Sequence, residues 1–292
     1  MKRTRMLLKL AALDLGAWLA SKRLACLLAA GAAGVLIGPL FISFTFGSDE
    51  VIYADVVMSS VWLLSIGAAL LLASSSAAED AESGRTALLK TNGASAGVIA
   101  AAKIVSAGAG AFVLWTATTS AALAATGNGH VRTWGTAGVA VLILAATLPM
   151  PHKYRVPVAA AAALAAAAGN AGFLFYASPL PAPAAVISIL PVSAAMGAAG
   201  AAAGLSFRMP VAVAGSLGCW VLLFIFHGYA WGAGGGSGIL AGLPVMELPP
   251  DAWAALSAGE TAGVLCGFIF SSGCIMGLSW VWGALAVDKR DV

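Results

Sequence analysis

The feature that most constrains this chain is a series of eight apolar stretches, most of them about as long as a bilayer is thick. A helix needs roughly 20 apolar residues to cross the hydrocarbon core of a membrane. Because 61% of the residues are hydrophobic and only 9% are charged, no part of the chain has the composition of a soluble domain. The sequence therefore predicts an all-α, polytopic transmembrane helical bundle. Its spans run over Leu24–Phe46, Ala54–Ala77, Val98–Ala125, Gly135–Met150, Val156–Ala177, Ala184–Phe207, Val211–Tyr229 and Thr261–Val287.

A bundle of six spans is the alternative, with residues 156–207 forming shorter or re-entrant pieces. The basic residues give both versions the same direction. With the N-terminus in the cytoplasm, every Lys and Arg except Arg132 falls on the cytoplasmic side. Basic residues concentrate on that side of membrane proteins. We therefore expect both termini in the cytoplasm, with residues 288–292 as a short tail.

Residues 1–23 and 230–260 are two of the long segments outside the predicted spans. The first is interrupted by Lys9 and Asp14, which argues against a cleaved signal peptide. It predicts an amphipathic helix in the cytoplasmic interface, because its bases lie apart from one apolar face. That face holds Leu8, Ala11, Ala12, Leu15, Trp18 and Leu19. The glycine-rich segment 230–260 predicts an outer loop that dips into or lies on the outer leaflet.

Several kinds of chemistry find no support in the sequence. The chain has no Gly-x-x-x-x-Gly-Lys-Ser/Thr motif for ATP, no His-Glu-x-x-His and no Cys-x-x-Cys. The histidines His130, His152 and His227 are scattered, and the four cysteines lie in apolar runs. We therefore expect no catalytic residue, no metal site and no cofactor in this chain, which is not predicted to be an enzyme. The small net charge of +3, without a basic soluble face, predicts no nucleic-acid partner.

The middle of each predicted span lacks charge, which lowers the expectation of an ion-coupled carrier. A carrier that couples transport to a proton gradient nevertheless stays open as one hypothesis for the function. The few polar residues in the spans suit a lipidic or amphipathic cargo. They are Thr116, Thr118, Thr119, Ser120, Asn170, Ser188 and Ser193. Small residues over 197–204 and 159–168 let helix backbones approach closely, either within the bundle or at a subunit interface.

A dense charged segment, Glu79–Lys90, joins the second and third predicted spans on the cytoplasmic side. It holds three acids and two bases and includes the pair Leu88-Leu89. We expect its acids to stand at the start of a short surface helix, where the helix dipole favours negative charge. Residues 92–95 should then form a turn. The segment is interpreted either as a charged loop that enforces topology or as a docking element for a cytoplasmic partner.

This segment resembles the signature of ABC-2-type transporter permeases. The resemblance rests on Glu79, Glu82, Ser83-Gly84-Arg85, Leu88-Leu89, the turn at 92–95 and Lys103. The amphipathic helix before the first span and the long outer loop before the last also match that family. The sequence differs from the family pattern in three respects. Its turn lacks a proline, Arg85 stands where Thr is commoner, and eight spans are predicted where six are usual.

The resemblance implies a multi-pass permease of the bacterial cytoplasmic (inner) membrane that exports its substrate. Residues 79–97 would contain the coupling helix, and a separate cytoplasmic ABC ATPase subunit, which carries ATP and Mg, would dock on it. The implied docking residues are Glu79, Asp80, Glu82, Gly84, Arg85, Leu88 and Leu89. A second permease copy or a related permease, and membrane lipids, are the other implied partners. The alternative function is a non-catalytic structural subunit of a larger membrane complex.

Overall fold

The computed structural model describes residues 2–21, 23–24, 26–27, 29, 49–126, 129–147, 151–176, 183–232 and 258–289. Within these residues all regular secondary structure is α-helical and no strand occurs, which confirms the predicted all-α class. The helices are α1 (Lys2–Leu19), α3 (Asp49–Glu82), α4 (Arg85–Thr91), α5 (Ala96–Thr126), α6 (His130–Thr147), α7 (His152–Tyr176), α8 (Pro183–Ser206), α9 (Met209–Gly232) and α11 (Ala258–Lys289).

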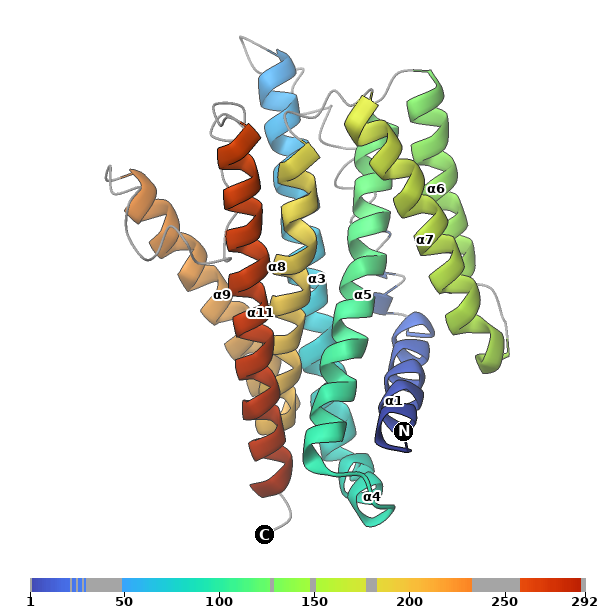
Figure 1. Ribbon diagram of the computed structural model, residues 1–292, viewed down its shortest axis with the longest axis vertical. Coiled ribbons are helices and arrows are strands. Elements are labelled where there is room, and N and C mark those ends of the chain that lie inside the picture. Colours follow the sequence, from blue (N-terminus) through green and yellow to red (C-terminus); the bar gives the residue numbers. More distant parts are fainter. Residues whose placement is uncertain are drawn as a thin grey trace.

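Four long helices, α3, α5, α8 and α11, run side by side through the centre of the molecule (Figure 1). Helices α6 and α7 pack on one flank of α5, and α9 leans away on the other flank after contacting α3 and α8. Helix α1 lies against α5 and α7. The start of α1, helix α4 and the end of α11 all lie at one end of the bundle, which we call the α4 end. The first and last described helices therefore have their outer ends on the same side as the charged segment.

In the part of the chain that the structure describes, four helical segments are long and apolar enough to cross a membrane: Val61–Glu82, Ala96–Ala125, Ala184–Ser206 and Gly259–Lys289. The molecule is thus a helical protein with the character of a membrane protein. The first three are mostly buried, whereas only 17% of the Gly259–Lys289 window is buried. The predicted first span, Leu24–Phe46, falls almost wholly outside the described residues, as does most of the predicted 230–260 loop. The count of eight spans stays a prediction.

The helices extend beyond the apolar stretches that predicted them. Helix α3 runs about one turn past the expected 54–77 at both ends. Helices α9 and α11 likewise continue into the two ends of the expected outer loop. Polar residues beyond the expected span, such as Glu50, Glu79 and Asp80, still belong to α3, because a charged side chain ends an apolar stretch without breaking the helix. Hydropathy alone therefore predicted the apolar part of each helix and missed the polar helical turns at its ends.

The small residues of α8 bring its backbone against α3. A Cβ atom added at Gly204 would lie 2.4 Å from the Ser74 carbonyl oxygen, and one at Gly200 would lie 2.7 Å from the Leu70 carbonyl oxygen. Both neighbours are backbone atoms, so only glycine fits. The predicted face of small residues over 197–204 is confirmed as packing within the bundle.

Buried polar side chains join α5 to its neighbours. The Asn170 amide of α7 donates to the Thr116 carbonyl at 3.2 Å and to the Ser120 hydroxyl at 3.0 Å. The hydroxyls of Ser65 in α3 and Thr118 in α5 lie 2.8 Å apart. The seven polar residues that the sequence suggested as contacts for a cargo are all buried. These contacts therefore hold helices together, as polar pairs do in apolar surroundings.

Helix α1 packs on α5 through an aromatic contact. A Cβ atom at Gly110 would lie 2.1 Å from Trp18 Cζ3, so the glycine makes room for the buried indole ring. The buried face of α1 also includes Leu10, Ala11 and Leu19, whereas Leu8 of the predicted apolar face is 59% exposed. The apolar surface of this helix is thus wider than the part that packs on the bundle.

We expect Gly204→Ala to destabilise the protein by about 1–3 kcal/mol, because the new methyl group meets the α3 backbone. The thermal unfolding midpoint in detergent measures this. Gly277→Ala in α11 is the matched control, because a Cβ atom there has nothing within 4 Å. Equal midpoints for the two variants would contradict the packing described for α3 and α8.

Candidate functional site at the α4 end

The charged segment is divided between two helices rather than forming one. Glu79, Asp80 and Glu82 lie in the last turns of α3, and Arg85 begins the short helix α4. The sequence placed these acids at the start of a helix; the structure instead has them at the end of one. The helix dipole disfavours negative charge at that end, so each acid needs a compensating partner.

Glycines make the two reversals of the chain around α4. Gly84 has φ 75° and Gly93 has φ 86°, the left-handed region that side chains rarely adopt. The amide N–H of Gly93 donates to the Lys90 carbonyl at 2.9 Å, which closes the end of α4. Because α5 begins at Ala96, the predicted turn over residues 92–95 is confirmed.

Beneath α4 lies a cluster of four charged side chains from four helices, Asp14, Asp80, Arg85 and Lys103. Lys103 of α5 binds both carboxylates: its Nζ lies 3.1 Å from Asp14 Oδ1 of α1, and it also donates to Asp80 Oδ2 of α3. Arg85 of α4 binds the same two acids, at 3.1 Å from Asp80 and 3.6 Å from Asp14. Two acids and two bases therefore join α1, α3, α4 and α5 in one network.

The cluster is shielded from solvent. The side chains of Lys103 and Asp14 are 5% and 7% exposed, that of Asp80 is 16% exposed and that of Arg85 is 36% exposed. Lys103 stands about two turns inside α5, so its charge depends on these partners. Arg85 closes the cluster on its outer side.

Burial raises the pKa of the Asp14 carboxyl above its ordinary value of 3.8, and this outweighs the lowering by the Lys103 ammonium. The folded protein thus holds this proton more tightly than the unfolded chain does. The contribution of Asp14 to stability is therefore complete below pH 3.8 and falls as the pH rises through the folded pKa. An ionised Asp14 is a net cost to the fold, which is typical of charge kept for a specific geometry or a function.

The other two acids have separate partners. Arg23 Nη1 lies 3.3 Å from Glu79 Oε2, and both side chains are largely exposed. Glu82 accepts the backbone N–H of Met209 at 2.6 Å, which caps the start of α9. Three of the segment's acids therefore bind three different parts of the chain.

One leucine of the pair in α4 is exposed to solvent, and the other is partly buried. Leu88 is 62% exposed. Leu89 packs against the core beside Met6 of α1. Lys90 reaches α11, where its Nζ donates to the Val287 carbonyl at 3.2 Å and lies 3.7 Å from Asp288 Oδ1. Helix α4 thus contacts α1 and α11 while presenting one leucine outward.

A polar cleft of about 530 Å³ lies between α1 and α3 beside the cluster. Its wall includes Trp18, Ser75, Ser76, Glu79 and Arg85. The α4 end therefore offers a partner an exposed leucine, exposed carboxylates and a polar recess within one surface. Of the docking residues expected from the sequence, Glu79, Glu82, Gly84 and Leu88 are exposed, whereas Asp80 and Arg85 are bound in the charged cluster.

Within the described residues no group of three or more His, Cys, Asp or Glu side chains is arranged to hold a metal ion. His130 is exposed in the first turn of α6. The acids of the α4 end are bound by bases or by an N–H group. The charged groups of this end therefore connect helices to one another.

Comparisons of the chain with protein-family models, with curated proteins and with solved structures found no match.

Sequence reasoning missed Asp14 as a partner of the charged segment. One signal was available: Asp14 lies three residues after Ala11 and four before Trp18, on the apolar face of the predicted helix. An acid on such a face needs a base from another helix. Lys103 was noticed for its place at the start of a span, but its two acidic partners were not.

We expect Lys103→Met to destabilise the protein by about 3–5 kcal/mol, because Asp14 and Asp80 would face each other with Arg85 as their remaining base. Thermal unfolding in detergent at neutral pH measures the change. The matched control is Arg23→Ala, which removes an exposed ion pair worth less than about 1 kcal/mol. Equal effects of the two substitutions would mean that Lys103 is not buried between the acids.

Proposed function

We propose that this chain is the membrane-spanning permease subunit of an ABC-2-like transporter, driven by a separate ATPase that docks at the α4 end. The observation that carries the proposal is the buried cluster beneath α4. It joins an exposed short helix to α1, α3 and α5 through Arg85 and Lys103. A force applied to α4 would therefore reach α3 and α1 through Arg85, and α5 through the acids that Lys103 shares with Arg85.

The exposed part of the segment supports the docking role. Leu88 presents apolar surface where the chain turns between α3 and α5, and Glu79 presents an exposed carboxylate nearby. An ATPase groove with an apolar pocket and basic rim would fit this surface, because charge-assisted contacts strengthen such an interface. Asp80 and Arg85 would act behind the interface by holding α4 to the bundle.

In this proposal, ATP-driven closure of the ATPase pair pushes α4 against the bundle. The network at Lys103 would pass the movement to α1 and α5, which would shift between inward-open and outward-open arrangements. ATP and Mg would stay on the partner, and a second permease copy or a related permease would complete the transporter. The location would be a bacterial inner membrane, with the α4 end in the cytoplasm.

The basic residues support that orientation. Arg85, Lys90, Lys103 and Lys289 lie at the α4 end of the described structure, and Arg132 lies at the opposite end, in the first turns of α6 (Figure 1). Basic residues favour the cytoplasmic side. The cargo would be lipidic or amphipathic. Five of the seven polar side chains of the spans bond to another helix or to their own backbone, and the hydroxyls of Thr119 and Ser193 are buried without a hydrogen-bond partner among the described residues. The support for this cargo is therefore the apolar character of the bundle.

A structural subunit of a larger membrane complex is the second candidate. It is favoured by α11, whose apolar face includes Phe270 at 75% and Leu278 at 70% exposure. Another integral-membrane chain or the lipid itself would cover that face. An ATPase partner distinguishes the two candidates.

We expect the tagged full-length chain, purified from its native host in mild detergent, to bring with it an ATPase that carries a Walker motif. Leu88→Lys should reduce the recovered ATP hydrolysis about tenfold, because it puts a charge into the proposed apolar pocket. Leu8→Lys is the matched control, since Leu8 is 59% exposed in α1 and Leu88 is 62% exposed.

Recovery of other polytopic proteins without an ATPase would contradict the proposed function and favour the structural subunit. So would equal ATP hydrolysis from the Leu88→Lys and Leu8→Lys preparations. Transport that persists without ATP and collapses with the pH gradient would instead identify a proton-coupled carrier.

A further inference from the structure

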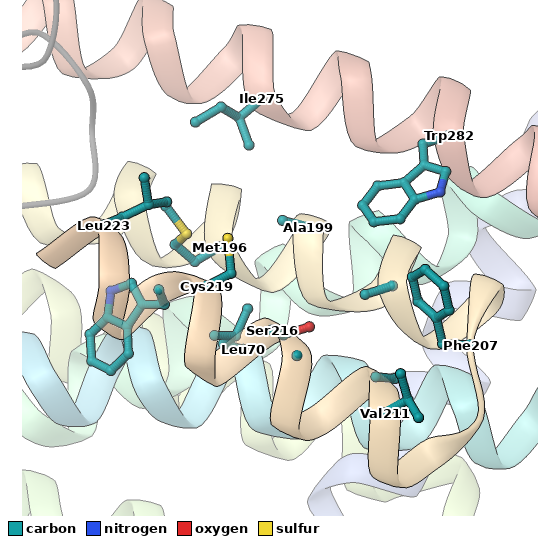
Figure 2. A pocket seen from close by; sticks show the side chains of 14 residues that line it. Leu70, Met196, Ala199, Phe207, Val211, Ser216, Cys219, Leu223, Ile275 and Trp282 are labelled. Carbon is teal, nitrogen blue, oxygen red and sulfur yellow. The ribbon is translucent and has the colours of Figure 1, made fainter. Parts of the chain in front are cut away.

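An apolar cleft lies on the far side of the bundle from α1, between α8, α9 and α11 (Figure 2). Its volume is about 540 Å³, within the range of sites that hold small molecules. The residues on its walls include Met196, Phe207, Val211, Gly215, Cys219 and Trp282. The cleft shares no residue with the charged cluster and is a separate feature.

The walls favour hydrocarbon over a polar ligand. Nearly all the side chains that line the cleft are apolar. The hydroxyl oxygen of Ser216 and the indole nitrogen of Trp220 are the polar exceptions besides Trp282, and both atoms are buried. Neither therefore presents hydrogen-bonding surface to the cleft.

The length of the cleft matches one leaflet of a bilayer. It follows α9 from Val211 to Leu223, which is roughly 18 Å at about 1.5 Å per residue. Half of the hydrocarbon core of a membrane is about 15 Å thick. The cleft begins at the turn between α8 and α9, at the α4 end, and reaches toward the middle of the bundle. A single extended chain from the leaflet on that side would fill it.

The surroundings supply such a chain. Three of the helices that line the cleft, α3, α8 and α11, contain segments apolar enough to span a membrane. Helix α9 leans away from α11, so the cleft lies between helices that diverge toward the outside of the bundle (Figure 1). Val221 and Leu222 of α9 are also exposed. In a membrane, lipid acyl chains would therefore be the medium next to the cleft.

A positive charge stands at the α4 end of the cleft. Arg208 lies between Phe207 and Val211, which both line it, and its side chain is exposed with no ion pair among the described residues. Phe207 and Trp282 meet edge to face at a centroid distance of 6.3 Å in the same region. Aromatic and basic side chains at this level are typical of the boundary between hydrocarbon and headgroups.

We propose that the cleft between α8, α9 and α11 binds one acyl chain of an anionic phospholipid from the leaflet at the α4 end, with the lipid phosphate at Arg208. The length of the cleft supports one acyl chain from that leaflet, and the exposed Arg208, next to Phe207 in the sequence, supports an anionic headgroup. This lipid site does not depend on the proposed transport function. The protein would meet the same lipids as a permease subunit or as a structural subunit of a larger membrane complex.

The test uses the full chain in nanodiscs that contain phosphatidylglycerol with a photoreactive diazirine in its acyl chain. Mass spectrometry of the peptides should find adducts on residues 209–223 and 275–282. Gly215→Leu should lower that yield about tenfold, because its side chain displaces roughly two methylene groups. A Cβ atom at Gly215 meets nothing within 4 Å, so the variant has room to fold.

Gly218→Leu is the matched control and should leave the yield unchanged, because Gly218 is equally open but does not line the cleft. Arg208→Gln should remove the preference for phosphatidylglycerol over a phosphatidylcholine probe. Equal yields for the Gly215→Leu and Gly218→Leu variants would overturn the proposal, and so would adducts spread over the outer face of α11. A dimer that native mass spectrometry detects in the parent chain and not in Gly215→Leu would assign the cleft to a second copy instead.

Discussion

The arrangement of the α4 end depends on one buried ammonium group. Lys103 lies between Asp14 and Asp80, and Arg85 binds the same two carboxylates from the outer side. A buried cation without partners would be prohibitively costly, so the positions of these helices are linked by a requirement for charge balance. Burial raises the pKa of the Asp14 carboxyl, so the network holds this carboxylate at a cost that its bases only partly offset. It selects one geometry for α1, α3, α4 and α5.

Close packing makes that geometry possible. Gly110 admits the ring of Trp18, which brings α1 against α5, and Gly200 and Gly204 bring α8 against the backbone of α3. A larger side chain at any of these positions would separate the helices and lengthen the contacts at their ends. The α4 end is therefore the place where a tightly packed bundle meets a short helix held mainly by charge. The cleft on the opposite flank arises where α9 diverges and packing is loose.

The sequence predicted the helical class and the approximate extent of each described long helix, because hydropathy reports directly on burial in an apolar medium. It also predicted the turn at 92–95 from its Asn and Gly residues. The sequence did not predict which charged residues form ion pairs with one another. The acids at 79–82 were expected at a helix start, but their partners, Lys103, Arg23 and the Met209 amide, come from distant parts of the chain. Which charges meet depends on how the helices pack, and a one-dimensional pattern does not contain that information.

Hydrogen exchange of the purified chain, compared with its Lys103→Met variant, shows whether one buried ammonium group links these helices. If one charged network holds these helices, the amides of α1 and α4 should lose protection together in the variant. The amides of α6, which has no residue in the network, should keep theirs. Unchanged protection in α1 and α4, or a loss spread evenly over all helices, would contradict the account.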